Sequence, residues 1–178
     1  MPADETHGTD ETYVVGLDGS PGSYAALDWA VRHAARTGAR VHAVMAWQYV
    51  PEPWSPTMRP AVVTPEESED AARHIVQLAL MPYRDTGVEL AGDVEHGAAW
   101  RVLTEVSGDA ALLVVGSRGH GAVAGALLGS VAQRCTTHAG CPVVVIPHRV
   151  TTRDEREGVL GAPAVRRLDG RPTDGSPT

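Results

Sequence analysis

The stretch VVGSRGHGAVAGALLGSVAQRC, from Val114 to Cys135, joins an apolar run to a helical pattern through a glycine-rich segment. Its five glycines are Gly116, Gly119, Gly121, Gly125 and Gly129. Glycine has no Cβ, so its backbone can approach other groups closely, but it loses more conformational entropy on folding than any other residue. The segment therefore indicates a place where another group must approach the backbone more closely than a side chain would allow.

Apolar runs and helical patterns alternate along the rest of the chain. Apolar runs predict strands at 13–18, 41–47, 88–95, 110–115 and 141–146, the last of them buried. Apolar spacings of three and four predict a helix after each of the first four strands. The predicted buried faces are Leu27, Ala30, Val31 and Ala34 in the first helix, Ile75, Leu78 and Ala79 in the second, Ala99, Val102, Leu103 and Val106 in the third, and Val131, Cys135 and Ala139 in the fourth. This alternation predicts an α/β fold with an open parallel sheet and helices on both faces.

Turn residues divide the chain further. Gly19 to Gly22 ends the first strand and begins the first helix, which Gly38 closes. Five prolines between 51 and 65 predict a loop, and Pro82 should end or kink the second helix. The polar composition after Arg149 predicts a mobile tail. We expect an N-terminal extension at 1–11, one domain at 12–148 and a flexible tail at 149–178.

Composition excludes several classes of function. The chain has no lysine, so a lysine Schiff base and a Walker lysine are excluded. A net charge of −7 argues against nucleic acid as a partner. Two cysteines, Cys135 and Cys141, are too few for a disulfide framework, and Cys135 is expected to be a small core residue. No stretch approaches the ~20 apolar residues of a membrane span, and the polar start does not resemble a signal peptide, so we expect a cytoplasmic protein.

The glycine-rich segment has the features of a phosphate-binding loop. In open α/β sheets ligands bind beyond the carboxyl ends of the strands, where Asp18 and Gly116 are predicted to lie. Gly129 and Ser130 open the next helix, whose free amides and dipole favour an anion, and Ser130 can also cap that helix. Asp18 is expected to face this loop, and an acid in such a place more often has a functional role than a role in the turn alone. Arg118 and His120 are not predicted to bind phosphate. Any phosphate here is held without a lysine.

At these residues the sequence resembles the universal stress protein family. The spacing Gly116-x2-Gly119-x9-Gly129-Ser130 is similar to the nucleotide-loop signature of that family, G-x2-G-x9-G-[ST]. The segments VVGLDGSPGSYAALDWA and DAALLVVGSRGHG resemble its first strand-loop-helix unit and its fourth strand. The resemblance extends over about residues 11 to 148.

This resemblance implies a single domain with strand order 3-2-1-4-5, of the adenine-nucleotide α-hydrolase-like or Rossmann-like type. It also implies bound ATP with Mg²⁺ and a homodimer paired through the last strand, Val143–Ile146. By position, Asp18 is expected near the ribose or the metal, and the backbone of Ala46 beside the adenine. The remaining expected cofactor-binding residues are Leu17, Gly116, Ser117, Gly119, Gly129, Ser130 and Val131.

Two functions of other classes stay open. The segment GHGAVA, residues 119–124, satisfies the G-x-G-x-x-[GA] pattern of a dinucleotide-dependent oxidoreductase, but it follows the fourth predicted strand and no acid lies about twenty residues onward. An interaction module of the same fold without a nucleotide is the other alternative. No Ser/His/Asp or Cys/His set is visible, so binding, with slow ATP hydrolysis at most, is the expected activity.

Overall fold

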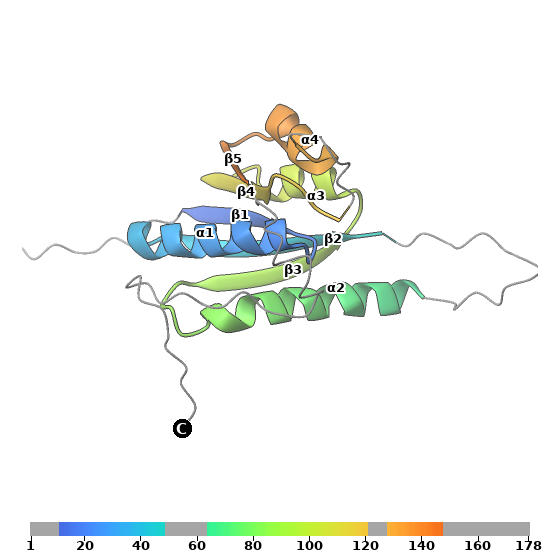
Figure 1. Ribbon diagram of the computed structural model, residues 1–178, viewed down its shortest axis with the longest axis horizontal. Coiled ribbons are helices and arrows are strands. Elements are labelled where there is room, and N and C mark those ends of the chain that lie inside the picture. The colour runs from blue at the N-terminus through green and yellow to red at the C-terminus, as the bar shows by residue number, and fades with distance from the viewer. Residues whose placement is uncertain (1–10, 49–63, 121–127, 148–178) are drawn as a thin grey trace, which may run out of the picture. The chain divides into compact units, whose positions relative to one another are not determined.

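The computed structural model describes residues 11–48, 64–120 and 128–147 (Figure 1). Its strands are β1 (Thr12–Leu17), β2 (Arg40–Trp47), β3 (Leu90–His96), β4 (Leu112–Gly116) and β5 (Val143–Ile146). Its helices are α1 (Pro21–Thr37), α2 (Pro65–Leu80), α3 (Ala99–Val106) and α4 (Ser130–His138), with a short 3-10 helix, η1, at Met81–Tyr83. The proline-rich loop up to residue 63, the N-terminal extension up to residue 10 and the tail from 149 lie outside the described residues.

The five strands form one parallel sheet in the order β3-β2-β1-β4-β5. Both the fold class and the strand order expected from the family resemblance are therefore confirmed. The chain moves to one side of β1 through β2 and β3, and then to the other side through β4 and β5 (Figure 1). This reversal leaves a crevice at the carboxyl ends of β1 and β4, because the loops that follow these two strands lead away on opposite faces.

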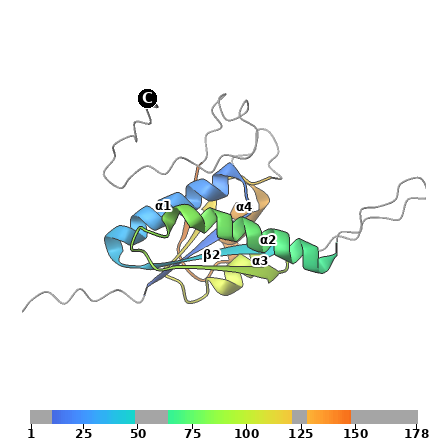
Figure 2. The same ribbon diagram turned by 90° about the horizontal axis from the view of Figure 1, so that it is seen from below.

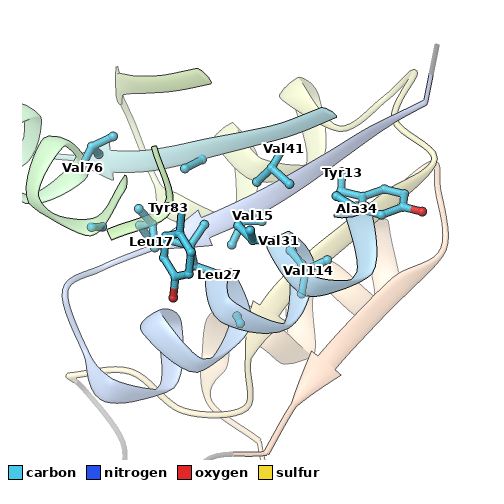
Figure 3. Close-up of a cluster of buried hydrophobic side chains, with 14 of the residues drawn as sticks. Tyr13, Val15, Leu17, Leu27, Val31, Ala34, Val41, Val76, Tyr83 and Val114 are labelled. Carbon is cyan, nitrogen blue, oxygen red and sulfur yellow. The ribbon is translucent and has the colours of Figure 1, made fainter. Parts of the chain in front are cut away.

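Two apolar layers hold helices on both faces of the sheet. Alternate residues of β1 point to opposite sides, as strand geometry requires. Tyr13 and Val15 pack under α1 and α2, whereas Val14 packs under α3 and α4. Figure 3 shows the first layer, where Leu27 and Val31 of α1 meet Val15. Seen from below in Figure 2, α1 and α2 both lie across the same face of the sheet.

Helix α1 begins and ends where its sequence predicts. The Ser20 hydroxyl accepts a hydrogen bond from the Ser23 amide at 3.2 Å, and Pro21 occupies the first turn, where its missing N–H costs nothing. Gly38 follows the helix with φ +79°, and its amide donates to the Ala34 carbonyl at 2.8 Å. That left-handed conformation is why the closing residue is a glycine.

Helix α2 differs in its buried face from the prediction. Leu78 is 45% exposed, whereas the buried residues of the helix are Ala72, Val76 and Ala79. The buried face follows the contact with β3, where the Val76 side chain lies directly over Gly92. The end of the helix is as predicted, since α2 stops at Leu80 and Pro82 lies within η1.

The last strand also differs from the prediction. All four residues of β5 are half-buried rather than buried, because β5 pairs only with β4 and forms an edge of the described sheet. Cys135 is fully buried on α4, as predicted, and burial raises the pKa of its thiol to about 11, with a smaller contribution from Cys141. Among the described residues, no helix combines the length and the apolar character needed to cross a bilayer.

Candidate functional site

A cleft lies at the carboxyl ends of β1 and β4, where the loops that follow these strands meet. Most of the residues predicted to bind a cofactor line it, namely Leu17, Asp18, Gly116, Gly119, Gly129, Ser130 and Val131. Ala46 and Ser117 are predicted site residues that do not line it among the described residues. The topology therefore brings together positions that are more than a hundred residues apart in the sequence.

Gly22, in the first turn of α1, and Gly116, the last residue of β4, are needed because their backbones touch. A Cβ on Gly116 would lie 2.6 Å from the carbonyl carbon of Gly22, far inside van der Waals contact. A Cβ on Gly22 would in turn overlap the carbonyl oxygen of Arg118. The start of α1 thus packs at glycines against the end of β4 and against the loop that follows it.

Gly119 is required by Asp18. A Cβ on Gly119 would overlap the Oδ2 atom of the Asp18 carboxylate. The Oδ1 atom of the same carboxylate accepts a hydrogen bond from the Ser20 amide at 2.9 Å, which fixes the turn before α1. Asp18 therefore organises both loops, in addition to presenting a carboxylate at the cleft.

Gly129 lacks any such requirement among the described residues. Its φ of −72° and ψ of 160° are available to every residue type. A Cβ there would lie 3.5 Å from the Ser117 carbonyl oxygen and 3.6 Å from the Cα of Arg118, which is ordinary contact. The described protein thus leaves room for a side chain at Gly129 that the sequence does not use.

The N-terminus of α4 presents unused hydrogen-bond donors at the cleft. The Gly129 amide donates to the Ser117 carbonyl at 2.7 Å. The next three amides, those of Ser130, Val131 and Ala132, have no acceptor among the described residues, and all three residues line the cleft. The first turn holds neither a side-chain cap nor an acid. Helix α2, by contrast, satisfies its N-terminus with a capping box between Thr64 and Glu67.

Ser130 is the first residue of α4 rather than its cap, because Gly129 occupies the N-cap position. The alternative that Ser130 serves only as a cap is therefore wrong. The Ser130 residue is exposed, and its hydroxyl makes no hydrogen bond to a described residue. Together with the three free amides, this hydroxyl forms a set of donors suited to an oxyanion.

Ser117 holds the fold together behind the cleft. Its amide donates to the Ile146 carbonyl at 2.8 Å, and its carbonyl accepts from Gly129. The backbone of Ser117 is therefore occupied by β5 and α4, and the residue is only 7% exposed. Its backbone amide is not available to a ligand in this arrangement.

The backbone of Ala46 faces the space left where the chain turns away after β1. Arg40 donates its amide to Glu11 beside β1, whereas Val41 donates to Glu89 beside β3. Because backbone groups alternate in direction along a strand, the carbonyl of Ala46 points to the β1 side. The pairing of β1 with β2 ends at Leu17 and Met45, and no described residue donates a hydrogen bond to the Ala46 carbonyl. Among the residues that the structure describes, the Ala46 carbonyl is therefore an open acceptor at the carboxyl end of β2, beside the turn that follows β1.

Several cleft residues carried no predictive sequence signal. Ala99 and Leu103 of α3 line the cleft, and the Leu103 side chain fills the space where a Cβ on Gly16 would lie, at 2.7 Å. Arg118 and His120, which lie in the glycine-rich segment but are not predicted to bind phosphate, also line it, and the His120 ring lies beside Gly19. The only signal for α3 is its own apolar stripe, which does not show that this helix reaches the cleft.

The charges of the cleft are mixed. Its ionisable side chains among the described residues are those of Asp18, Arg118 and His120. In the part of the chain that the structure describes, no three His, Cys, Asp or Glu side chains are grouped to hold a metal ion. Since Mg²⁺ is commonly bound by one or two carboxylates together with phosphate oxygens, Asp18 is suited to such a site only if a ligand supplies the other oxygens.

The comparisons with known proteins show the family of this chain. The model of the universal stress protein family matches residues 11–147. This chain belongs to the universal stress protein family. A universal stress protein of Mycobacterium tuberculosis is 36% identical over 177 residues, which cover 91% of this chain and 55% of that protein. The chain thus spans about half the length of the curated relatives it matches.

Solved structures of the family share the fold. A universal stress protein crystallised in complex with cAMP is 30% identical, with a TM-score of 0.58, covering 76% of this chain and 96% of that one. A universal stress protein from Archaeoglobus fulgidus in complex with dAMP is 21% identical, with a TM-score of 0.57, covering 76% and 97%. At that identity the second likeness supports the fold alone, whereas the first also places this universal stress protein near one that binds an adenine nucleotide.

Proposed function

We propose that this universal stress protein binds ATP with Mg²⁺ in the cleft and acts in the stress response as a regulatory nucleotide-binding protein. The observation that carries the proposal is the contrast between its glycines. Gly116 and Gly119 are required by contacts within the protein, whereas the described residues leave space at Gly129 beside three amides that have no acceptor among them. A phosphate group needs both an open approach and free donors, and a helix N-terminus adds a favourable dipole.

The residues take the following roles in this proposal. The amides of Ser130 and Val131, with the Ser130 hydroxyl, hold the phosphates, and the bare backbone at Gly129 allows close approach. Asp18 lies near the ribose or holds Mg²⁺ jointly with phosphate oxygens. The backbone of Ala46 meets the adenine edge, because a carbonyl oxygen accepts from an exocyclic amino group. Gly116, Gly119, Leu17 and Ser117 shape the loops around the ligand.

Calorimetry tests the proposal most directly. Titrations with ATP, ADP, AMP and cAMP, each with and without Mg²⁺, are expected to show ATP with Mg²⁺ as the tightest ligand. The melting temperature should rise with ATP concentration, because a ligand that binds only the folded state stabilises it by mass action. No heat of binding and no rise in melting temperature at millimolar ATP would overturn it. In that case a nucleotide-free interaction module becomes the better description.

We further propose that the protein is a homodimer paired through β5. The residues of β5 are apolar and half-buried, and one side of the strand has no partner among the described residues. An exposed apolar edge strand is an aggregation hazard unless another strand or segment covers it.

The cytoplasm remains our proposed location, because both cysteines, Cys135 and Cys141, are free thiols in the structure, as expected of a reducing compartment.

A further inference from the structure

A cationic and aromatic cluster lies where α3 and α4 meet, apart from the residues that line the cleft. Its members are Trp100 and Arg101 of α3, and Arg134 and His138 of α4; together they are called the Trp100 patch below. The guanidinium carbons of Arg101 and Arg134 each lie 5.2 Å from the centre of the Trp100 ring. The His138 ring also lies 5.2 Å from the Trp100 ring, tilted by 49°. Three basic side chains thus lie around the indole ring of Trp100.

The two arginines of the Trp100 patch have no anionic partner among the described residues. Neither forms an ion pair or a side-chain hydrogen bond with a described residue, although other arginines do, such as Arg32 with Asp28. Both are exposed, whereas Trp100 is half-buried. Both guanidinium groups are cations close to the same ring, and neither is paired with an acid among the described residues, so both can attract an anionic ligand that reaches this surface.

The charge of this surface contrasts with the chain as a whole. The chain carries a net charge of −7, yet α3 has one acid, Glu105, and α4 has none. Helix α2, on the opposite face of the sheet, carries four acids in its first six residues, Glu66, Glu67, Glu69 and Asp70. Charge is therefore segregated, and the Trp100 patch is a locally cationic surface on an acidic protein.

The side chains of the patch are held in position before any partner arrives. A guanidinium stacked on an indole loses part of its rotamer freedom in advance, so less entropy is lost on binding. The Nδ1–H of His138 donates to the Arg134 carbonyl at 2.9 Å, which fixes that ring. Trp and Arg are also the residue types that contribute most to binding hot spots. The unused N–H donors of both guanidinium groups match the two oxygens of a carboxylate.

We propose that the Trp100 patch binds an acidic segment of a partner protein, in which neighbouring Asp or Glu side chains pair with Arg101 and Arg134. A single-stranded nucleic acid fits less well. Its bases need a free aromatic face for stacking, and guanidinium groups already lie over the Trp100 ring. This proposal does not depend on whether the cleft holds ATP.

The test uses the full-length chain and a fluorescein-labelled peptide of repeated glutamates, with binding followed by fluorescence anisotropy at physiological ionic strength. The double substitution Arg101→Ala with Arg134→Ala is expected to weaken peptide binding about tenfold or more. The matched control is Arg36→Ala with Arg84→Ala, two exposed arginines outside the patch that change the net charge equally. The control should weaken binding no more than about twofold.

A third variant separates preorganisation from charge. Trp100→Leu keeps an apolar residue on α3 but removes the ring, and it should weaken the peptide while both arginines remain. Equal losses in the patch pair and the control pair would overturn the proposal, as would the absence of peptide binding to the unsubstituted chain. Light scattering that shows a smaller assembly only for the patch pair would identify a second copy as the occupant instead. Tighter patch-dependent binding of a labelled oligothymidylate would identify nucleic acid.

Discussion

The Cα atom of Gly119 lies against the carboxylate of Asp18, so closely that a methyl group at Gly119 would overlap Oδ2. These two residues are 101 positions apart in the sequence, and their contact joins the loop after β1 to the loop after β4. Since the Oδ1 atom of Asp18 also fixes the turn before α1, the contact links α1 to the glycine-rich loop.

This contact predicts that Gly119→Ala destabilises the fold. Overpacking of a tight contact usually costs about 1–3 kcal/mol, so the free energy of unfolding measured in urea should fall by that amount. Gly129→Ala is the matched substitution, because a Cβ there meets only ordinary contacts, and it should change stability by less than about 0.5 kcal/mol. Equal losses of stability in the two variants would contradict the distinction between their roles.

The free amides of α4 predict an order of effects on ATP affinity. Gly129→Val should be the most damaging, because it places a branched side chain where the phosphate approaches. Ser130→Ala should weaken ATP about 10- to 100-fold, since a hydrogen bond to a charged group contributes roughly 1.5–3 kcal/mol. Thr136→Ala, on the same helix but away from the cleft, should bind normally.

The tail gives a further control for the ATP site. Deleting residues 152–178 should leave ATP affinity nearly unchanged if the tail has no part in the cleft. Calorimetry on the four variants gives the ranking. Loss of ATP binding in the tail deletion, with normal binding in both loop variants, would show that the assignment of the cleft is wrong.

The direction of the β5 backbone groups predicts which substitution in this strand should break the dimer and leave the sheet folded. The carbonyls of Pro142 and Ile146 accept hydrogen bonds from the β4 side, so by alternation the amide of Val145 points to the free edge. Val145→Pro removes that outward amide and no amide of the ladder to β4, and an edge strand tolerates proline at such a position. It also replaces a half-buried valine side chain, so Val145→Ala is the control for lost packing. Light scattering should then report a monomer with an unchanged circular dichroism spectrum. Val144→Pro breaks the ladder to β4 and should unfold the sheet edge. A Val145→Pro protein that keeps twice the chain mass would rule out pairing through this edge.

The two cysteines should differ in reactivity. Burial raises the pKa of Cys135 to about 11, so its reactive thiolate is scarce near pH 8, whereas Cys141 is half-buried. Ellman's reagent at pH 8 should label Cys141 promptly and Cys135 only after denaturation. Because the folded pKa of Cys135 is raised, its contribution to stability is present below its unfolded value and is lost as the pH rises toward 11. Fast labelling of the one remaining thiol, Cys135, in the native Cys141→Ser variant would contradict this assignment.

The order and type of the elements followed from the sequence alone, because their signals are local. The apolar stripe of Leu27, Ala30, Val31 and Ala34 predicts the buried face of α1, and Gly38 predicts its end, since both depend on neighbours within one or two turns. The strand order came from the family resemblance of the glycine signature rather than from periodicity. The positions of Asp18 and the glycine-rich loop at one cleft followed from that topology.

Only the tertiary structure decided which of these residues has which physical task. Gly116, Gly119 and Gly129 look alike in the sequence, yet the first two are required by contacts with Gly22 and Asp18, and the third is not. Likewise Leu78 is exposed and Val76 is buried because α2 is rotated to fit Gly92 on β3. The Trp100 patch, too, exists only once α3 packs on α4. Local patterns record how a segment folds by itself, whereas close approach, burial and charge clustering arise between segments that the sequence does not place together.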